Sequence, residues 1–236
     1  ITGNTVLRNG DAGISVLGSI GATNVGNNTV GDNGRFGIEI KNSQGTSGNL
    51  VVQNNTITRN TAPAWLTPAS AAKDYAGIAV IRRAPNTADG YADQPSGATL
   101  RGNTISGFVN PGADGEGFAI VVEGSNNVVT KNLLSGNDIG VQVQGGNGTS
   151  DVLGTPQFDR GQASPGTNNV VTRNSITTNT LTLRNVGMPV TSATCNWYGS
   201  ALGTGTNVSG FTTFPWLTSS NLDEAGCPPG NTVPTN

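Results

Sequence analysis

The sequence has few side chains of the kinds that perform chemistry. Its 236 residues contain no histidine, two cysteines and one methionine, and only 11% of them are charged. Without histidine or a Cys-x-x-Cys motif, the usual kinds of zinc site are not expected. The scarcity of methionine and leucine argues against a helical bundle or coiled coil. Only 12 Lys and Arg stand against 14 Asp and Glu, with no basic cluster, which argues against nucleic-acid binding.

Long apolar runs are missing as well. The longest, Phe118–Val122, is far below the ~20 residues that a membrane span requires. The first residues, Ile1–Val6, lack the basic and apolar regions of a signal peptide and resemble the middle of a strand. We therefore expect no membrane span, and we expect the chain to be a mature or excised piece of a longer protein.

Glycine and asparagine are in excess. The chain contains 35 Gly and 29 Asn, which together exceed a quarter of its residues, and its formal net charge is −2. A disordered chain usually carries a higher net charge, and collagen needs a glycine at every third position. The composition therefore indicates a turn-rich, neutral, all-β protein.

An internal repeat explains this excess. Seven segments place an aliphatic residue, or alanine in the last, three positions before an asparagine. These asparagines are Asn4, Asn28, Asn55, Asn103, Asn132, Asn174 and Asn196. A second segment with apolar residues at period two follows each of the first six and predicts a strand with one buried face. These segments begin at Gly13, Gly37, Gly77, Gly117, Gly140 and Leu181. Between the two elements stands a second asparagine column: Asn9, Asn33, Asn60, Asn137 and Asn179.

The repeat predicts a solenoid. A unit of about 24 residues cannot bury its own apolar face, and stacking successive units solves this because each strand pairs with its counterpart ~4.8 Å along the axis. Valine and isoleucine columns would fill the interior, and stacked asparagine amides would hydrogen-bond at the turns. We expect a parallel β-helix of about seven coils with inserted loops, roughly 30–35 Å long.

These features resemble the right-handed parallel β-helix proteins of the pectate-lyase-like superfold, over residues 1 to about 216. The stretches Cys195–Ser200 and Phe211–Leu217 look like the last coil and closing segment of secreted bacterial members. The resemblance implies right-handedness and an extracellular or cell-surface location. We expect the β-helix and its closing coil to occupy residues 1–217 and a tail or linker to occupy 218–236.

The two cysteines lie near the C-terminus. Cys195 and Cys227 could be buried thiols, but low lysine content and a Pro/Gly/Thr-rich tail favour a secreted protein and hence a disulfide. A loop of that length would gain roughly 3–4 kcal/mol in the chain-entropy model. We expect this bond to tie the tail back to the β-helix.

The residues that interrupt the repeat are the candidates for function, because insertions in a solenoid project as loops. The largest insertions are 61–76, 82–99, 107–116 and 145–167. They could flank the outer face of the sheet formed by the segments that begin at Gly13, Gly37, Gly77, Gly117 and Gly140, and so form a groove. Aromatic rings beside arginine and carboxylate are suited to sugars. The candidate glycan groove consists of Trp65, Tyr75, Arg82, Arg83, Tyr91, Asp114 and Glu116. The alternative is that the aromatic residues hold each loop on the rod and the charges keep it soluble.

The expected outward columns offer little for catalysis, since glycoside hydrolysis needs two carboxylates flanking one bond. The column expected on the glycine strands is Ser15, Glu39, Ala79, Ala119, Gln142 and Thr182. The column after the asparagine ladder is Thr5, Thr29, Thr56, Thr104, Leu133 and Ser175. The first column contains one acid and the second contains none, so we assign no catalytic residues. Leu133 interrupts the single threonine column, which argues against ice binding.

No cofactor or metal site is assigned. The turn at 112–117 holds Asp114 and Glu116, whose oxygens could bind Ca²⁺, but a solvated turn explains them as well.

Two functions remain open. The first is an extracellular, non-catalytic structural or adhesive module that could assemble end to end with copies of itself, because an open first coil presents unpaired backbone groups. The alternative is a polysaccharide-binding or polysaccharide-degrading lyase or hydrolase that uses the inserted loops. The expected partners are extracellular polysaccharide or other copies of the chain.

Overall fold

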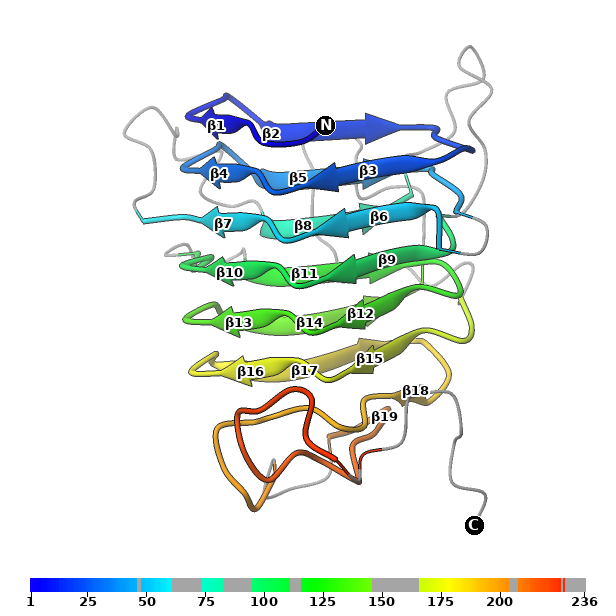
Figure 1. Cartoon of the computed structure of the whole chain (residues 1–236). Coiled ribbons are helices and arrows are strands. Elements are labelled where there is room, and N and C mark those ends of the chain that lie inside the picture. Colours follow the sequence, from blue (N-terminus) through cyan, green and yellow to red (C-terminus); the bar gives the residue numbers. More distant parts are fainter. Residues whose placement is uncertain are drawn as a thin grey trace.

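The computed structural model describes residues 1–45, 48–60, 74–82, 95–110, 116–145, 166–203, 208–225 and 227. Within these ranges every regular element is a β-strand, and all strand pairs are parallel. The strands form three sheets that wind into a solenoid, with one strand of each sheet in each complete coil (Figure 1). The predicted all-β parallel β-helix is confirmed.

The three sheets are named A, B and C. Sheet A contains β3 (Thr23–Gly26), β6 (Leu50–Gln53), β9 (Ala98–Arg101), β12 (Val128–Thr130), β15 (Val170–Thr172), β18 (Thr191–Ser192) and β19 (Phe211–Thr212). Sheet B contains β1 (Thr5–Leu7), β4 (Thr29–Gly31), β7 (Thr56–Thr58), β10 (Thr104–Ser106), β13 (Leu133–Ser135) and β16 (Ser175–Thr177). Sheet C contains β2 (Ala12–Leu17), β5 (Phe36–Lys41), β8 (Tyr75–Ile81), β11 (Gly117–Glu123), β14 (Ile139–Gln144) and β17 (Leu181–Val186).

Aliphatic columns fill the interior between the sheets. On sheet B the central residue of each strand points inward, and from β4 to β16 these residues are Val30, Ile57, Ile105, Leu134 and Ile176. All five are at most 1% exposed. Burying each such side chain contributes roughly 1.5–3 kcal/mol. The outward threonine column from Thr5 to Ser175, with Leu133 within it, has the predicted register.

A continuous asparagine ladder joins the coils where sheet A turns into sheet B. In each coil the asparagine donates its backbone N–H and its Nδ2–H to the Oδ1 of the asparagine in the next coil. For Asn103 and Asn132 both distances are 2.9 Å. The ladder runs through Asn4, Asn28, Asn55, Asn103, Asn132, Asn174 and Asn196. The residue before each of the last six has a positive φ, for example Gly102 at +65° and Lys131 at +54°. The predicted ladder is confirmed.

The second asparagine column is less regular than predicted. Asn9 donates to Asn33, and Asn137 donates to Asn179, with Nδ2–Oδ1 distances of 2.9 Å in both pairs. Asn60 does not continue the ladder from Asn33. Its backbone N–H donates instead to a carboxylate oxygen of Asp32 at 2.9 Å. This ladder is therefore broken in the third coil.

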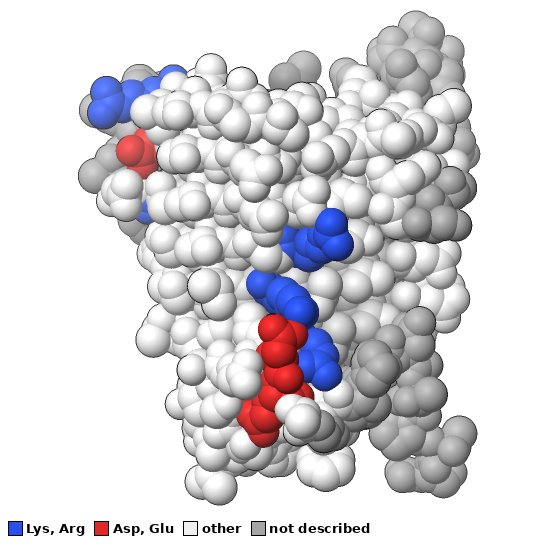
Figure 2. Space-filling model, viewed as in Figure 1, with Lys and Arg blue, Asp and Glu red and all other residues white. Residues whose placement is uncertain are grey.

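The closing segment covers the C-terminal end of the coils. The backbone N–H of Leu217 donates to Asn196 at 3.0 Å, and the buried Leu217 side chain packs beside the disulfide. Cys195 and Cys227 are bonded, with their Cα atoms 5.5 Å apart, so the predicted disulfide is confirmed. Lys131 pairs with Asp223 at 2.5 Å. In Figure 2 basic and acidic side chains meet near this end, while most of the same face is uncharged.

Candidate functional site

The outer face of sheet C carries polar side chains in register. The strand pairing places three columns on this face. The first is Ala12, Phe36, Ala76, Phe118, Ile139 and Leu181. The second is Ser15, Glu39, Ala79, Val121, Gln142 and Arg184. The third is Leu17, Lys41, Ile81, Glu123, Gln144 and Val186.

The expected outward column was wrong at two positions, Ala119 and Thr182. The sequence aligns Gly117 with Gly77, but in the structure Gly117 pairs with Tyr75 and Ala119 takes the place of Gly77. Gly77 lies at a crowded inward position, since a Cβ there would stand 2.3 Å from Cγ2 of Ile105. Ala119 occupies this position in the next coil. Aligning the two strands by their glycines therefore shifts the predicted pairing of β11 with β8 by two residues.

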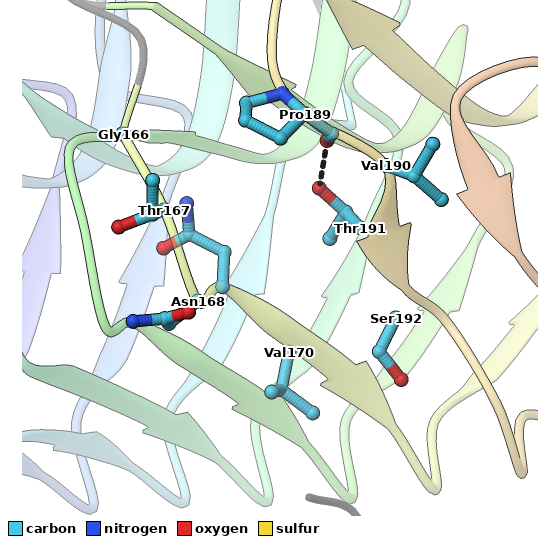
Figure 3. A pocket seen from close by; sticks show the side chains of 9 residues that line it. Gly166, Thr167, Asn168, Val170, Pro189, Val190, Thr191 and Ser192 are labelled. Atoms are coloured by element: carbon cyan, nitrogen blue, oxygen red, sulfur yellow. Dashed lines mark hydrogen bonds between the residues drawn. The ribbon is translucent and has the colours of Figure 1, made fainter. Parts of the chain in front are cut away.

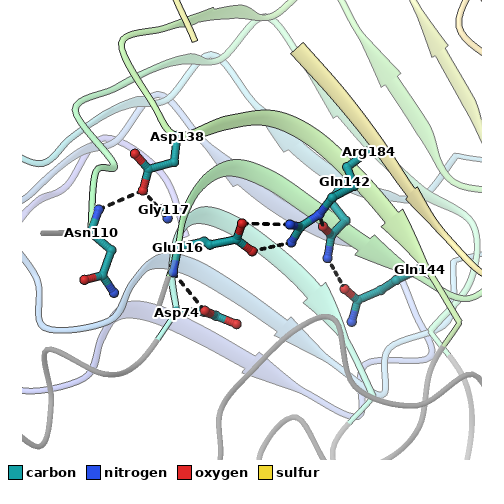
Figure 4. A network of polar contacts seen from close by, with 8 residues as sticks. All are labelled: Asp74, Asn110, Glu116, Gly117, Asp138, Gln142, Gln144 and Arg184. Carbon is teal, nitrogen blue, oxygen red and sulfur yellow. Dashed lines mark hydrogen bonds and ion pairs between the residues drawn. The ribbon is translucent and has the colours of Figure 1, made fainter. Parts of the chain in front are cut away.

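The correct register brings a second acid and an arginine onto the face. Glu123 accepts a hydrogen bond from Nε2 of Gln144 at 2.7 Å. Gln144 in turn accepts one from Gln142, and Gln142 accepts one from Nε of Arg184. The guanidinium then makes two parallel bonds of 2.7 and 2.5 Å to Glu116 (Figure 4). Such bidentate pairs are stronger than single neutral hydrogen bonds.

The network continues along the edge of sheet C at which its strands begin. The backbone N–H of Glu116 donates to Asp74 at 3.0 Å. On the neighbouring coil one carboxylate oxygen of Asp138 accepts the N–H groups of Asn110 and Gly117 at 2.9 and 2.8 Å. These carboxylates therefore hold the corner in place by accepting backbone hydrogen bonds (Figure 4).

Glu39 is the second acid in the outward columns. Its carboxylate lies 3.0 Å from Nζ of Lys41, two residues along the same strand, and it accepts the hydroxyl of Ser15 at 3.1 Å. Glu39 is 1% exposed and Glu123 is fully buried. A buried carboxylate needs such partners because losing its hydration is costly.

Arg59 and Tyr75 form a buried stack at the corner between sheets B and C. The guanidinium carbon stands 3.5 Å from the centre of the tyrosine ring, and Nη1 donates to the carbonyl of Gly34 at 3.1 Å. Burial raises the pKa of Tyr75, and the charge of Arg59 opposes that rise. Burial also lowers the pKa of Arg59. Tyr75 belongs to the interior apolar cluster.

Three of the seven candidate glycan-groove residues lie in the described structure. Tyr75 and Glu116 are adjacent, with the N–H of Tyr75 donating to the carbonyl of Glu116 at 2.9 Å. The backbone N–H of Arg82 donates to Glu123 at 2.5 Å. The other four, Trp65, Arg83, Tyr91 and Asp114, fall outside the described residues. The glycan groove therefore stays a prediction, as does the Ca²⁺ turn that needs Asp114.

Sequence reasoning missed Glu123, Gln144 and Arg184 as members of one network. Finding them from the sequence would have required the correct pairing of residues between β8 and β11. That pairing aligns Ala119 with Gly77 at the crowded inward position, and not Gly117 with Gly77. In the part of the chain that the structure covers, no three His, Cys, Asp or Glu side chains group as a metal site. The acids on the outer face and edge of sheet C are held by amide, hydroxyl, backbone and cationic partners, which suits stabilisation of that face.

The architecture defines the class of protein as a parallel β-helix. Residues 1–90 match the model of a family described as right handed beta helix region. The coils after residue 90 continue the same three sheets. No curated protein and no solved structure matches the chain. The described residues include no helix that is long and apolar enough to cross a membrane.

Proposed function

We propose that the protein is an extracellular, non-catalytic structural or adhesive β-helix module. The observation that carries this proposal is the unbroken ladder from Asn4 to Asn196, in which every coil is hydrogen-bonded to the next through side-chain amides. A solenoid gains its stability from contacts between neighbouring coils, so a continuous ladder favours a stiff rod.

The outer face of sheet C supports the same role. Its charged groups have partners within the fold, as in the bidentate pair of Arg184 and Glu116. Buried polar groups that satisfy one another make a face rigid and specific. A stiff rod is suited to holding binding segments away from a surface.

The experiment offers the purified chain acidic and neutral polysaccharides, with and without Ca²⁺. We expect no new reducing ends and no absorbance from an unsaturated uronate, and we expect retention on a polysaccharide-coated or cell-wall surface if the module is adhesive. Size-exclusion chromatography with light scattering reports whether copies assemble. Turnover of any polysaccharide would overturn the non-catalytic proposal.

A polysaccharide-degrading enzyme is the second candidate, and the presence of two acids in the outward columns of sheet C favours it. Glu39 and Glu123 stand on β5 and β11, beside Lys41 and Arg82. Two carboxylates at one bond are what glycoside hydrolysis requires. This candidate ranks second because both acids are at most 1% exposed.

The two candidates differ in their response to Glu123→Gln. The variant keeps the size of the side chain and removes its charge. If turnover is found, an enzyme at this face predicts that Glu123→Gln and Glu39→Gln each lose nearly all of it. A matched change on the first coil, Asp11→Asn, should have no effect. Equal activity in all variants would exclude this face as the catalytic site.

A further inference from the structure

A cleft opens where the last coils of sheet A separate. β15 pairs with β18 only at Val170 and Ser192, whereas β12 and β15 pair at three successive residues. On the N-terminal side of this pair the two segments diverge and border an open cavity of about 490 Å³. Figure 3 shows the two segments, 166–170 and 189–192, on opposite sides of it.

The described residues that line the cleft are uncharged. Its apolar side chains include Val170, Pro189 and Val190, and its polar ones include Thr167 and Ser192. None of the lining residues that the structure describes is charged. Val190 is 71% exposed at the opening. A cavity of this kind, apolar with a few placed polar groups, is typical of a small-molecule site, and its volume lies in the usual range.

An asparagine ladder ends at the wall of this cleft. Asn127 donates its backbone N–H and its Nδ2–H to Oδ1 of Asn169, both at 3.0 Å. The pairing of Val170 with Ser192 places Thr191 where the next asparagine would stand. The hydroxyl of Thr191 donates to the carbonyl of Pro189 at 3.2 Å (Figure 3). No hydrogen bond joins this hydroxyl to Asn169, so it does not replace the missing amide oxygen.

Asn169 is consequently left with two donors and no acceptor in the next coil. Its Nδ2 donates one hydrogen to Gly124 at 2.8 Å, which leaves the second hydrogen of the amide. Its backbone N–H meets no acceptor among the residues that the structure describes. Asn169 is 5% exposed, and a buried donor without a partner is costly. In every intact rung the same two donors converge on one carbonyl oxygen.

We propose that this cleft binds an uncharged N-acetylated sugar, whose acetamide oxygen takes the place of the missing asparagine Oδ1. The two donors of Asn169 hold the carbonyl, and the walls formed by Val170 and Pro189 contact the methyl group and the ring. The hydroxyl of Ser192 lies in reach of the sugar hydroxyls. The cleft is separate from sheet C and does not depend on the proposed scaffold role.

The first test follows the backbone amide signals of the labelled protein during titration with N-acetylglucosamine, glucose and glucosamine. We expect a saturable shift of the Asn169 amide with N-acetylglucosamine, and about tenfold weaker binding of glucose, which lacks the carbonyl. Glucosamine, which is charged and lacks the acetyl group, should bind no better than glucose. Equal binding of the three sugars, a shift confined to other residues, or no saturable shift would overturn the proposal.

The second test uses Thr191→Asn, which supplies the missing amide. We expect this variant to melt at a higher temperature than the wild type and to lose binding of N-acetylglucosamine at least tenfold, because Oδ1 occupies the place of the ligand oxygen. Thr104→Asn, on the exposed face of sheet B, is the matched control and should keep full binding. Full binding in Thr191→Asn would contradict the assigned position. The titration of the wild type decides the question if the variant does not fold.

Discussion

Removal of the Asn132 side chain tests whether the ladder holds the coils together. Asn132 is completely buried in the middle of the ladder. Its Oδ1 accepts two bonds from Asn103, and its Nδ2 donates to Leu100 and Asn174, each at 2.9 Å. In Asn132→Ala the backbone N–H and the amide of Asn103 and the carbonyl of Leu100 lose a partner while remaining buried.

The magnitude follows from those three groups. A buried group left without a partner costs ~1–3 kcal/mol, and at the lower part of that range, ~1–1.5 kcal/mol each, the expected loss in free energy of unfolding is about 3–4.5 kcal/mol. Asn4→Ala is the matched control. Asn4 is exposed at the start of the ladder and donates only to Thr2 and Asn28. Water can replace those bonds, so we expect this change to cost about 0.5 kcal/mol or less.

The assay is urea unfolding followed by circular dichroism and by tryptophan fluorescence, because a solenoid can unfold in parts and the two probes must agree before a free energy is quoted. If Asn132→Ala and Asn4→Ala lie within about 1 kcal/mol of each other, water or local movement satisfies the buried groups. The inference of a ladder that stiffens the rod would then be refuted.

Three further predictions concern the closing segment and sheet C. Replacing Cys195 and Cys227 by serine opens a loop with a sequence separation of 32 and should cost about 3–4 kcal/mol in urea unfolding; an unchanged midpoint would contradict this. Burial raises the pKa of Tyr198, so the stability that this tyrosine contributes is present below its unfolded pKa of ~10 and is lost as the pH rises above it. Alkaline unfolding curves should show this loss in the wild type and a smaller one in Tyr198→Phe, and identical curves would disprove it. Arg184→Met should cost about 2 kcal/mol in the same urea assay: up to ~1 for the pair with the partly exposed Glu116 and at least ~1 for the buried Gln142, which loses the donor to its side-chain oxygen; an unchanged midpoint would contradict this.

Local spacing was enough to predict most of the fold. The aliphatic residue three positions before each asparagine predicted the stacking of the coils, and the period-two segments that follow predicted the strands of sheet C. These signals work because each coil repeats the same contacts within a short stretch of chain. The excess of asparagine could therefore be assigned to the ladder without any knowledge of structure.

The site on sheet C could not be predicted in the same way. Gly77 and Gly117 look equivalent in sequence, yet the position that is crowded in the third coil is filled by Ala119 in the fourth. The shift of two residues keeps the alternation of inward and outward side chains, so the hydrophobic pattern does not reveal it. The shift does change which residues of neighbouring coils pair with one another. For this reason the sequence did not reveal the network from Glu123 to Arg184.

The end of a ladder is a place where a solenoid can acquire a binding site without any change in the coils before it. The ladder tolerates large differences in the chain between rungs: Asn28 and Asn55 are separated by 27 residues and Asn55 and Asn103 by 48, yet both Nδ2–Oδ1 distances are 2.9 Å. Loop length adds only ~0.6 kcal/mol of closure entropy per doubling, so inserted residues can change without disturbing the coils. A missing rung, in contrast, leaves two aimed donors on a rigid frame. The coils before Asn169 already hold its backbone and amide in place. Only a ligand oxygen is needed to accept the two donors that an asparagine Oδ1 accepts in the intact rungs.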